Sequence, residues 1–551
     1  MLNFSRRQFL AVSAASLATG SLSGCTTGTK NVQRRKPPAQ AELQLLFYAD
    51  THAQWQPVYA HPVANHLGPM SLLGQAPYIT EQSRLATLGL QKNQVAAAWL
   101  TAKGARKNSQ QLGKMGGYAV IAQALTNKRE AFGTEASLTL EGGQCWNGSG
   151  LASMTEGRYG PLSSHWLGAE VRVASEEAVL WPEISPQLYK EFNRPVLTAE
   201  SPVSYFTKAG VPIAVVGCVN PWQQFPEGFD EQKWLYDLQQ QINTAAKSAS
   251  LVILLSDAGT NPDLWLSMHL KGVDVILSSR GQDLWPQPVR IAGNSSSVPV
   301  CFAGSQGQGF VELKLRAEAG SWQLSMIYHP LFSDTEPAAS GVAQQITQVR
   351  AAYASWLDQP LAITPGWLYR RDALAGSWDQ IIAEALKTTG AELTLTPGLR
   401  HGLVLPPGRV ITRDHLFSLT GGYPATLFNL SAKRSELQSR LEAGADQLLS
   451  DDWFLHTSED LPRLTGSHFV LRYQALAGQR ISELDWPVAS TAEQLNVAGW
   501  STQYQGEGPA LWQLIENWLR AQPADWQLPE IEKPSLAFVD GHPGWHPEAL
   551  L

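Results

Sequence analysis

The sequence predicts an α/β protein made of two layered domains. Short runs rich in Val, Ile and Leu alternate with helical segments, and most runs end in a polar or Gly-containing loop, as buried strands do. The 551 residues are 44% hydrophobic, which is enough to bury two cores. The net charge of −7 lacks the positive excess of nucleic-acid-binding proteins, so we expect no nucleic-acid partner.

Residues 1–25 predict an export signal. Arg6 and Arg7 precede a short apolar stretch rich in Ala and Ser that ends "LSGC". This resembles a twin-arginine signal followed by a lipobox, with Cys25 as the lipidated residue. A chance basic start on a cytosolic protein is the alternative. We expect a periplasmic protein whose only membrane attachment is through Cys25, followed by a flexible polar tether at 26–42.

Residues 43–335 form the first predicted domain. The run "GFVELKLRAEAGSWQLSMIYHPL" (309–331) predicts two antiparallel strands around the turn "AEAGS". Cys145, Cys218 and Cys301 are an odd number once Cys25 is set aside, so we expect buried free thiols. Earlier strands of this domain are expected at 43–50, 136–143, 169–175, 211–220, 251–259, 272–279 and 298–304.

A helical linker is predicted at 336–360, because its middle has helical periodicity and its ends contain proline. A second α/β domain follows at 361–522. The tail, 523–551, is rich in proline and is expected to lie across the surface as extended chain. In the second domain we expect helices at 377–390, 432–449 and 510–522 and a strand at 391–398.

The stretch "YADTHAQWQPVY" is the most specific local signal. Alternate residues of an extended segment share a face, so Asp50 and His52 lie on one side of a strand tip. A carboxylate and an imidazole in this arrangement are good ligands for manganese, iron or zinc. A D-x-H motif alone is weak evidence, because a structural role would be equally common.

Several segments together resemble one family. "YADTHAQW", "GKMGGYAVIAQAL", "LEGGQCWNGSG", "SWDQIIAEAL", "TPGLRHG", "GYPATLF", "NVAGW" and "DGHPG" occur in order along the mature chain. They resemble the periplasmic SoxB-type thiosulfohydrolases of the 5′-nucleotidase superfamily. The resemblance implies a four-layer calcineurin-like metallophosphoesterase sandwich that holds two metals, usually manganese, and a C-terminal 5′-nucleotidase-type domain over the site. The family's substrate is a sulfonate on a cysteine of a carrier protein, which is hydrolysed to release sulfate.

Most of the metal ligands that the resemblance implies are replaced. Asp50 and His52 remain. Gln144 stands at the position of the bridging aspartate in the family's "GGD". Ser175 and Asp257 each stand at the position of one histidine. Arg280 and Gln282 stand at the two histidines of "GGHTH". The replaced positions are Gln144, Ser175, Asp257, Arg280 and Gln282.

Arginine cannot replace a metal-binding histidine, because a guanidinium is a permanent cation without an acceptor lone pair. Without metals, Asp50, Asp257 and nearby acidic groups would repel one another. We therefore predict that Arg280 lies in the pocket and bonds Asp50 or Asp257, with His52 and Gln144 completing the network. The alternative is that Arg280 points to solvent.

The second domain suggests substrate contacts. Arg400 stands where the family's similar "PGFRWG" segment has an arginine near the substrate, and could clamp an oxyanion with two hydrogen bonds. Bracing of a loop is the alternative role. Tyr423 and Trp146 are candidates for the lining of the same cleft, although the chain has 20 Trp.

Two functions fit these residues. The first is a non-catalytic relative of the thiosulfohydrolase, with no cofactor, that binds a sulfur-carrier protein, another Sox-type component or an oxyanion. The second is a working hydrolase with one divalent metal, such as manganese, on Asp50 and His52 with Gln144 or Asp257. Asp283 or Glu176 would lie near that metal. The presence of Arg280 favours the non-catalytic relative. A nucleotidase is least favoured, because the family resemblance is to the sulfur branch of the superfamily.

Changing both Arg6 and Arg7 to Lys should keep the protein in the cytoplasm, because twin-arginine export requires the arginine pair. Cell fractionation and immunoblotting measure this, and continued export would contradict the twin-arginine assignment. Cys25→Ser is the companion variant. It should release a soluble periplasmic form, and unchanged membrane partition would contradict the lipidation site.

Overall fold

The structure is a computed structural model that describes residues 35–224, 230–294, 296–422, 425–455, 459–487, 493–501 and 510–550. The predicted signal, Cys25 and most of the tether lie outside the described residues, as does Tyr423. The described part contains no helix long and apolar enough to cross a membrane.

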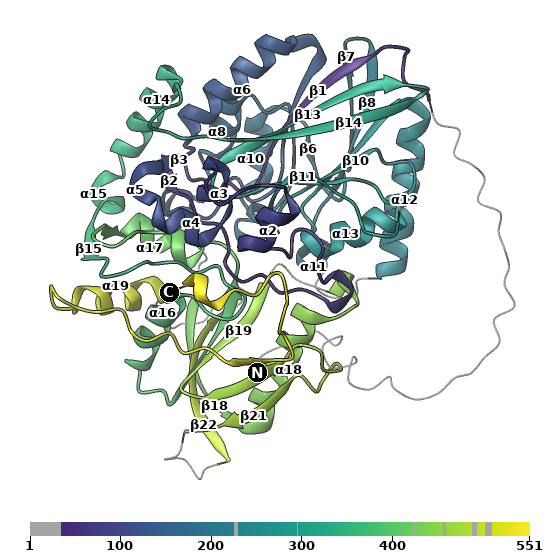
Figure 1. The fold of residues 1–551 in the computed structure, drawn as a ribbon. Helices are drawn as coiled ribbons and strands as arrows, with labels where there is room; N and C mark the ends of the chain where they lie inside the picture. The colour runs from purple at the N-terminus through teal and green to yellow at the C-terminus, as the bar shows by residue number, and fades with distance from the viewer. Residues whose placement is uncertain are drawn as a thin grey trace, which may run out of the picture.

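Two six-stranded sheets form the first domain (Figure 1). Their central strands are parallel, and β-hairpins add antiparallel strands at the edges. One sheet has the order β14 (Ser321–Pro330), β13 (Gly309–Glu318), β1 (Glu42–Tyr48), β4 (Ser137–Glu141), β5 (Val171–Val173) and β6 (Val196–Leu197). The other has the order β11 (Leu284–Val289), β12 (Val300–Ala303), β10 (Val275–Ser278), β9 (Leu251–Ser256), β8 (Val211–Cys218) and β7 (Val203–Lys208).

The burial pattern of the strands explains a four-layer arrangement. In β1, Leu45 and Phe47 face a core shared with β8, β9 and β10 of the other sheet. Leu46 and Tyr48, on the opposite face, pack against helices, because successive side chains of a strand alternate between faces. The helices on that side are α6 (Tyr118–Phe132), α8 (Gly160–Leu167) and α10 (Ser185–Phe192), and the outer face of the second sheet carries α12 (Glu231–Ser248) and α13 (Thr260–His269). The predicted α/β sandwich is confirmed.

The second domain is a smaller α/β unit. Its four-stranded sheet has the order β18 (Thr426–Lys433), β22 (Gln494–Ser501), β16 (Leu393–Leu399) and β19 (Glu459–Thr465). Helices α16 (Ser377–Lys387), α18 (Arg434–Leu449) and α19 (Leu511–Arg520) cover it. The linker contains α14 (Ser340–Ala351) and α15 (Ala354–Leu357).

The hairpin of β13 and β14 is present as predicted. Its strands pair from Gly309–Pro330 to Glu318–Ser321. The chain reverses at Ala319 and Gly320, whose φ angles are 49° and 79°. The three cysteines of the folded chain are free and buried, as expected.

The C-terminal tail is mostly extended chain at the surface, as predicted, and it also makes contacts that the sequence did not indicate. β23 (Ser535–Ala537) pairs with β20 (His468–Arg472), which also pairs with β21 (Ile481–Asp485). The chain then returns to the first domain, where the carbonyls of Pro543 and Gly544 accept bonds from the Thr80 and His66 amides at 3.0 and 2.8 Å. The prolines indicated extended chain, but they carry no information about which residues of the first domain this chain contacts. The tail therefore joins the two domains.

Gly544→Ala should lower the free energy of unfolding by about 1–3 kcal/mol, because overpacking a tight site forces backbone shifts. A Cβ at Gly544 would lie 2.3 Å from the His66 carbonyl oxygen and 2.6 Å from that of Tyr78. Gly341→Ala is the control, since nothing lies within 4 Å of a Cβ there. Urea unfolding measures both variants, and equal stability would contradict a tightly seated tail.

Candidate functional site

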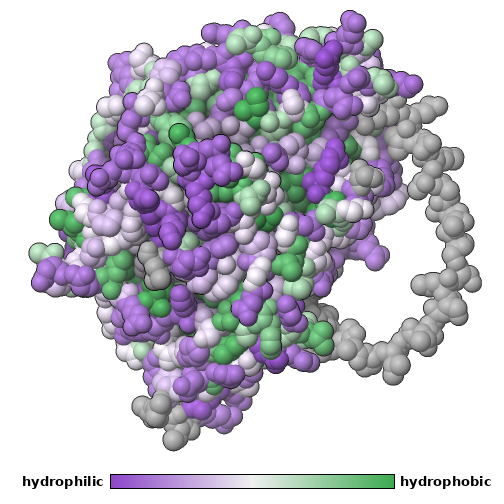
Figure 2. All heavy atoms as spheres, in the orientation of Figure 1, coloured by the Kyte–Doolittle hydropathy of each residue, from purple (hydrophilic) through white to green (hydrophobic). Residues whose placement is uncertain are grey.

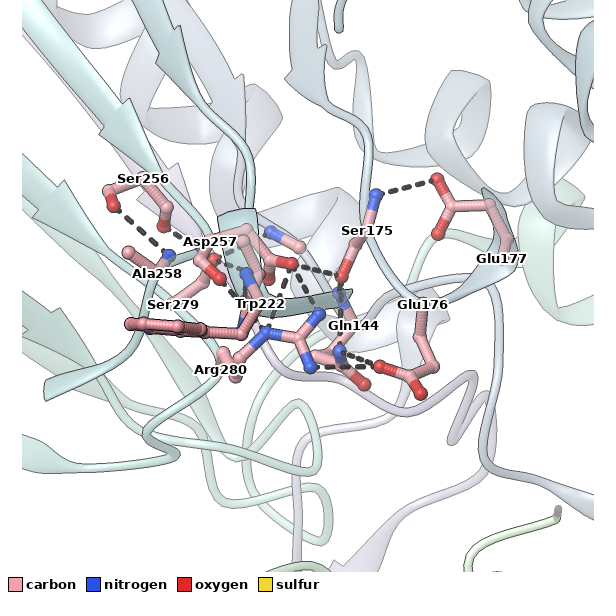
Figure 3. A network of polar contacts seen from close by, with 12 residues as sticks. Gln144, Ser175, Glu176, Glu177, Trp222, Ser256, Asp257, Ala258, Ser279 and Arg280 are labelled. Atoms are coloured by element: carbon pink, nitrogen blue, oxygen red, sulfur yellow. Dashed lines mark hydrogen bonds and ion pairs between the residues drawn. The ribbon is translucent and has the colours of Figure 1, made fainter. Parts of the chain in front are cut away.

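The candidate site lies where the parallel strands of both sheets end. Asp50 follows β1, Gln144 follows β4, Ser175 follows β5 and Asp257 follows β9. Arg280 and Gln282 follow β10. Carboxyl ends of parallel strands meet at one edge of a sheet, which is the usual place for ligand sites in α/β folds. The structure brings the predicted positions together at this edge (Figure 3).

Arg280 lies inside the site and binds two carboxylates. Its Nη2 donates to Asp257 Oδ2 at 2.6 Å and its Nη1 to Glu176 Oε2 at 2.8 Å, as Figure 3 shows. Its Nε donates to the Asp257 carbonyl at 2.9 Å. The side chain is 8% exposed. The predicted contact of Arg280 with Asp257 is confirmed, and the alternative of a solvent-facing Arg280 is wrong.

Asp50 is held by the backbone of the Arg280 loop. The amide of Arg280 donates to Oδ1 at 2.7 Å and that of Gln282 to Oδ2 at 2.8 Å. The hydrogen bonds to Asp50 thus come from these two amides, while the charge of the Arg280 guanidinium acts on Asp50 through space. Burial raises the pKa of Asp50 to about 8, although the two amides act in the opposite direction.

Neutral side chains connect the remaining groups. Ser175 Oγ donates to Asp257 Oδ2 at 2.8 Å, and Gln144 Nε2 donates to Glu176 Oε2 at 3.2 Å. Because an amide can donate where a carboxylate can only accept, Gln144 lies beside Glu176 without adding negative charge. Burial raises the pKa of Asp257 to about 6, and the charge of Arg280 opposes this shift. The same two carboxylates raise the pKa of Arg280 despite its burial.

The backbone of the site is strained. Several non-glycine residues have φ angles in the left-handed region, which costs about 1–3 kcal/mol each and is concentrated at functional sites. They are Asp50 (49°), His52 (50°), Gln144 (59°), Arg280 (71°) and Gln282 (58°). A backbone hydrogen bond joins the turns of His52 and Gln144, in which the His52 amide donates to the Gln144 carbonyl at 2.8 Å.

His52 departs from its predicted role in the Arg280 network. Its ring is 5.2 Å from the ring of His401 in the second domain, and the two are stacked. Among the described residues, neither ring nitrogen of the buried His52 makes a hydrogen bond of good geometry, although Gln282 lies close enough to act on its pKa. Burial lowers the pKa of His52 to about 4, so the ring is neutral at pH 7. A neutral ring that stacks on the other domain does not extend the ionic network.

The residues present do not fit the two-metal centre that the resemblance implies. The guanidinium of Arg280 binds the carboxylates of Asp257 and Glu176. A guanidinium has no lone pair with which to coordinate a metal. Both oxygens of Asp50 accept backbone amides. Within the described ranges, no cluster of three or more His, Cys, Asp or Glu side chains could hold a metal ion.

The two acidic residues expected near a single metal, Asp283 and Glu176, are also engaged. Asp283 accepts a bond from Thr260 at 2.5 Å and pairs with Arg371 of the second domain. His66 lies 3.5 Å from the same carboxylate. Glu176 pairs with Arg280.

Trp146 does not line the cleft, so its predicted role as a substrate contact is wrong. It is 1% exposed, its ring lies 3.6 Å from the Arg172 guanidinium, and its Nε1 donates to Ser164 at 2.8 Å. The large flat ring fills the core behind the Gln144 loop, where it covers a buried charge.

Arg400 is buried and its Nε donates to Asp460 at 3.0 Å. This contact favours the bracing role, although Nη1 and Nη2 of Arg400 have no hydrogen-bond partner among the described residues. Tyr423 lies outside the described residues, so its role stays a prediction.

The importance of Arg371 could not be inferred from the sequence. From the second domain it donates to the Gln282 carbonyl at 2.6 Å and binds the Asp283 carboxylate. It thus holds the loop that carries Arg280. The only sequence signal was the pair Arg370 and Arg371 in "YRRD", where Arg370 instead binds Asp379 inside its own domain.

Comparisons with solved structures give the same fold. The chain superposes on the sulfate thiohydrolase SoxB of Thermus thermophilus with a TM-score of 0.81 and 23% identity, over 91% of this chain and 98% of that one. A 5′-nucleotidase precursor of Thermus thermophilus gives a TM-score of 0.66 and 16% identity, over 90% and 99%. A 5′-nucleotidase assigned in Staphylococcus aureus gives 0.55 and 13%, over 90% and 100%. No protein-family model and no curated protein sequence matches.

Arg280→Ala should lower the free energy of unfolding by about 3–5 kcal/mol, because it leaves two buried carboxylates without a cation. The double variant Asp257→Ala/Arg280→Ala should recover part of this loss, since one of the stranded charges is removed as well. Arg316→Ala is the control, because Arg316 is 74% exposed and lies 3.7 Å from Glu42. Urea unfolding measures all three, and a loss for Arg280→Ala no larger than the control would contradict a stabilising ion cluster.

Proposed function

We propose that this chain is an exported, non-catalytic relative of the SoxB-type thiosulfohydrolases. It binds a sulfur-carrier protein, another component of the same pathway or an oxyanion, and does not hydrolyse it. One observation carries this proposal: the guanidinium of Arg280 lies between Asp257 and Glu176, at the site where the fold's hydrolases would hold metals.

The charge balance supports a non-catalytic site. Metals in a two-metal hydrolase neutralise the carboxylates, lower the pKa of a bound water and clamp the leaving oxygens. Arg280 supplies only the first of these functions, because a guanidinium cannot bind hydroxide as a metal does. Its pKa is raised by Asp257 and Glu176, so it stays charged. The fold is thereby stabilised without the groups that hydrolysis requires.

Arg400 supports the binding of an oxyanion. In the described part of the chain its Nη1 and Nη2 are buried without a hydrogen bond of good geometry, although Tyr78, Asp283 and Asp460 act on its charge. A buried guanidinium with unused donors is costly, and an anion would satisfy both donors at once. Because both nitrogens are covered, an anion reaches them only if the residues around Arg400 move.

The second candidate is a hydrolase with a single manganese ion. The retention of Asp50 and the neutral ring of His52 favour it, because a neutral imidazole is a metal ligand. A metal at this site would require Arg280 to leave Asp257.

The proposed location, for either candidate, is the periplasm, by twin-arginine export and with a lipid anchor on Cys25.

Metal analysis separates the two candidates. Protein purified from its native compartment, after growth with added manganese, should contain far less than one metal ion per chain. About two ions per chain, as in a two-metal site, would contradict the non-catalytic proposal, and one ion would favour the single-metal hydrolase. A thiosulfohydrolase with the intact ligand set, prepared in parallel, is the positive control.

A further inference from the structure

A long segment of the first domain is basic although the chain as a whole carries a net charge of −7. Between Asp50 and Glu130 the sole acidic residue is Glu81. Glu81 is 3% exposed and its Oε1 accepts the Ala102 amide at 2.6 Å. It therefore caps a helix and offsets little of the charge at the surface.

The exposed charges of this segment gather on one face. Helix α4 (Ala102–Lys107) carries Lys103 and Lys107 on its exposed side, with Arg106 half-buried between them. Lys114 is exposed on β3 (Lys114–Met115). Figure 2 shows hydrophilic residues gathered over this part of the molecule, where Figure 1 labels α4 and β3.

The second domain adds to the same face. Lys114 lies 5.7 Å from the Tyr59 ring centre and Arg409, from the second domain, lies 5.4 Å from it. The two cations therefore share one ring. Although Lys114 is exposed, partial desolvation of its ammonium group lowers its pKa, and the charge of Arg409 lowers it further. We define the basic face as Lys103, Arg106, Lys107, Lys114 and Arg409.

The basic face borders a pocket between the domains. His61, Arg106, Tyr369 and Arg371 line this pocket, and the Arg106 guanidinium lies 4.8 Å from the Tyr369 ring centre. A second pocket shares His61 and Arg371 and is lined by Gln282 and by Asp283, whose carboxylate pairs with Arg371. A group that enters here would thus approach the loop of Arg280.

Two acidic residues lie close to the basic face. Asp334 lies near Lys114 and acts on its pKa. Glu548 is 63% exposed on η4 (Pro547–Leu550), which packs against α4. These two carboxylates leave an excess of positive charge on the face.

We propose that the basic face is a docking surface for an acidic segment of a partner protein, with the interdomain pocket receiving the tip of that segment. This refines the proposed function, because it identifies the partner's chemistry as clustered carboxylates. Opposite charges speed association and select the partner. A recess walled by Tyr369 and Arg106 fits a projecting chain, whereas the headgroups of a flat bilayer would remain at its rim.

Binding of a fluorescent oligoglutamate peptide to the full-length protein tests this proposal. The variant Lys103→Glu/Lys107→Glu should weaken binding by about tenfold or more at low salt, since like charges then meet at the interface. Raising the salt from about 50 to about 200 mM should weaken binding to the wild type, because exposed charges are screened.

The matched control is Lys190→Glu/Lys247→Glu, which makes the same change in net charge at exposed positions on α10 and α12. It should leave peptide affinity within about twofold of wild type, since charges beyond a Debye length of about 10 Å are largely screened. Thermal unfolding of both double variants checks that they are folded.

Absence of peptide binding, or equal weakening by both double variants, would overturn the docking proposal. Preferential binding to phosphatidylglycerol vesicles, with loss in Lys103→Glu/Lys107→Glu, would also overturn it and assign the face to a membrane. None of these outcomes affects the metal content of the protein, so the proposed function is tested separately.

Discussion

The buried contact of Arg280 with Asp257 and Glu176 is the interaction on which the candidate site depends. Two carboxylates within a shared, desolvated space cannot both stay ionised without a cation between them. In two-metal hydrolases in general, the metal ions provide this compensation. Here the guanidinium of Arg280 provides a positive charge between the two carboxylates. The desolvation cost of such a cluster can equal its Coulomb energy. Its energetic effect is then seen mainly when Arg280 is lost, because the carboxylates are left buried without a cation.

The same loop connects this cluster to the second domain. The amides of Arg280 and Gln282 hold Asp50, while Arg371 binds the Gln282 carbonyl from across the interface. Asn65 donates to Asp372 at 2.8 Å and Gln54 to Ser418 at 2.7 Å, so polar contacts join the domains at further points. The strained φ angles of the loop are therefore maintained by tertiary contacts from both domains. A change at the interface would reach the Arg280 cluster through this loop.

Much of the fold was predictable because its causes are local. The strands β1, β4, β8 and β9 and the helices α16, α18 and α19 lie where hydrophobic periodicity indicated, within a few residues. A contact of Arg280 with Asp50 or Asp257 was predicted from the family resemblance and from charge, and the structure shows that Asp257 is the partner. Trp146 was not placed correctly, because a tryptophan beside a glycine loop has the same local sequence whether it faces a cleft or the core. The course of the tail was missed for a similar reason, since its partners His66 and Tyr78 lie more than 400 positions away in the sequence.

By itself, the sequence determined which residue types stand at the strand ends, and its resemblance to the thiosulfohydrolases predicts that Gln144, Ser175 and Arg280 replace metal-binding groups. It also determined the excess of positive charge between Asp50 and Glu130. Only the tertiary structure decided that Glu176 is the second partner of Arg280, that backbone amides hold Asp50, and that Arg371 holds the loop. The reason is physical. Charge and periodicity are properties of a residue and its neighbours, whereas the choice among several nearby carboxylates depends on distances that are set when both sheets and the second domain pack together.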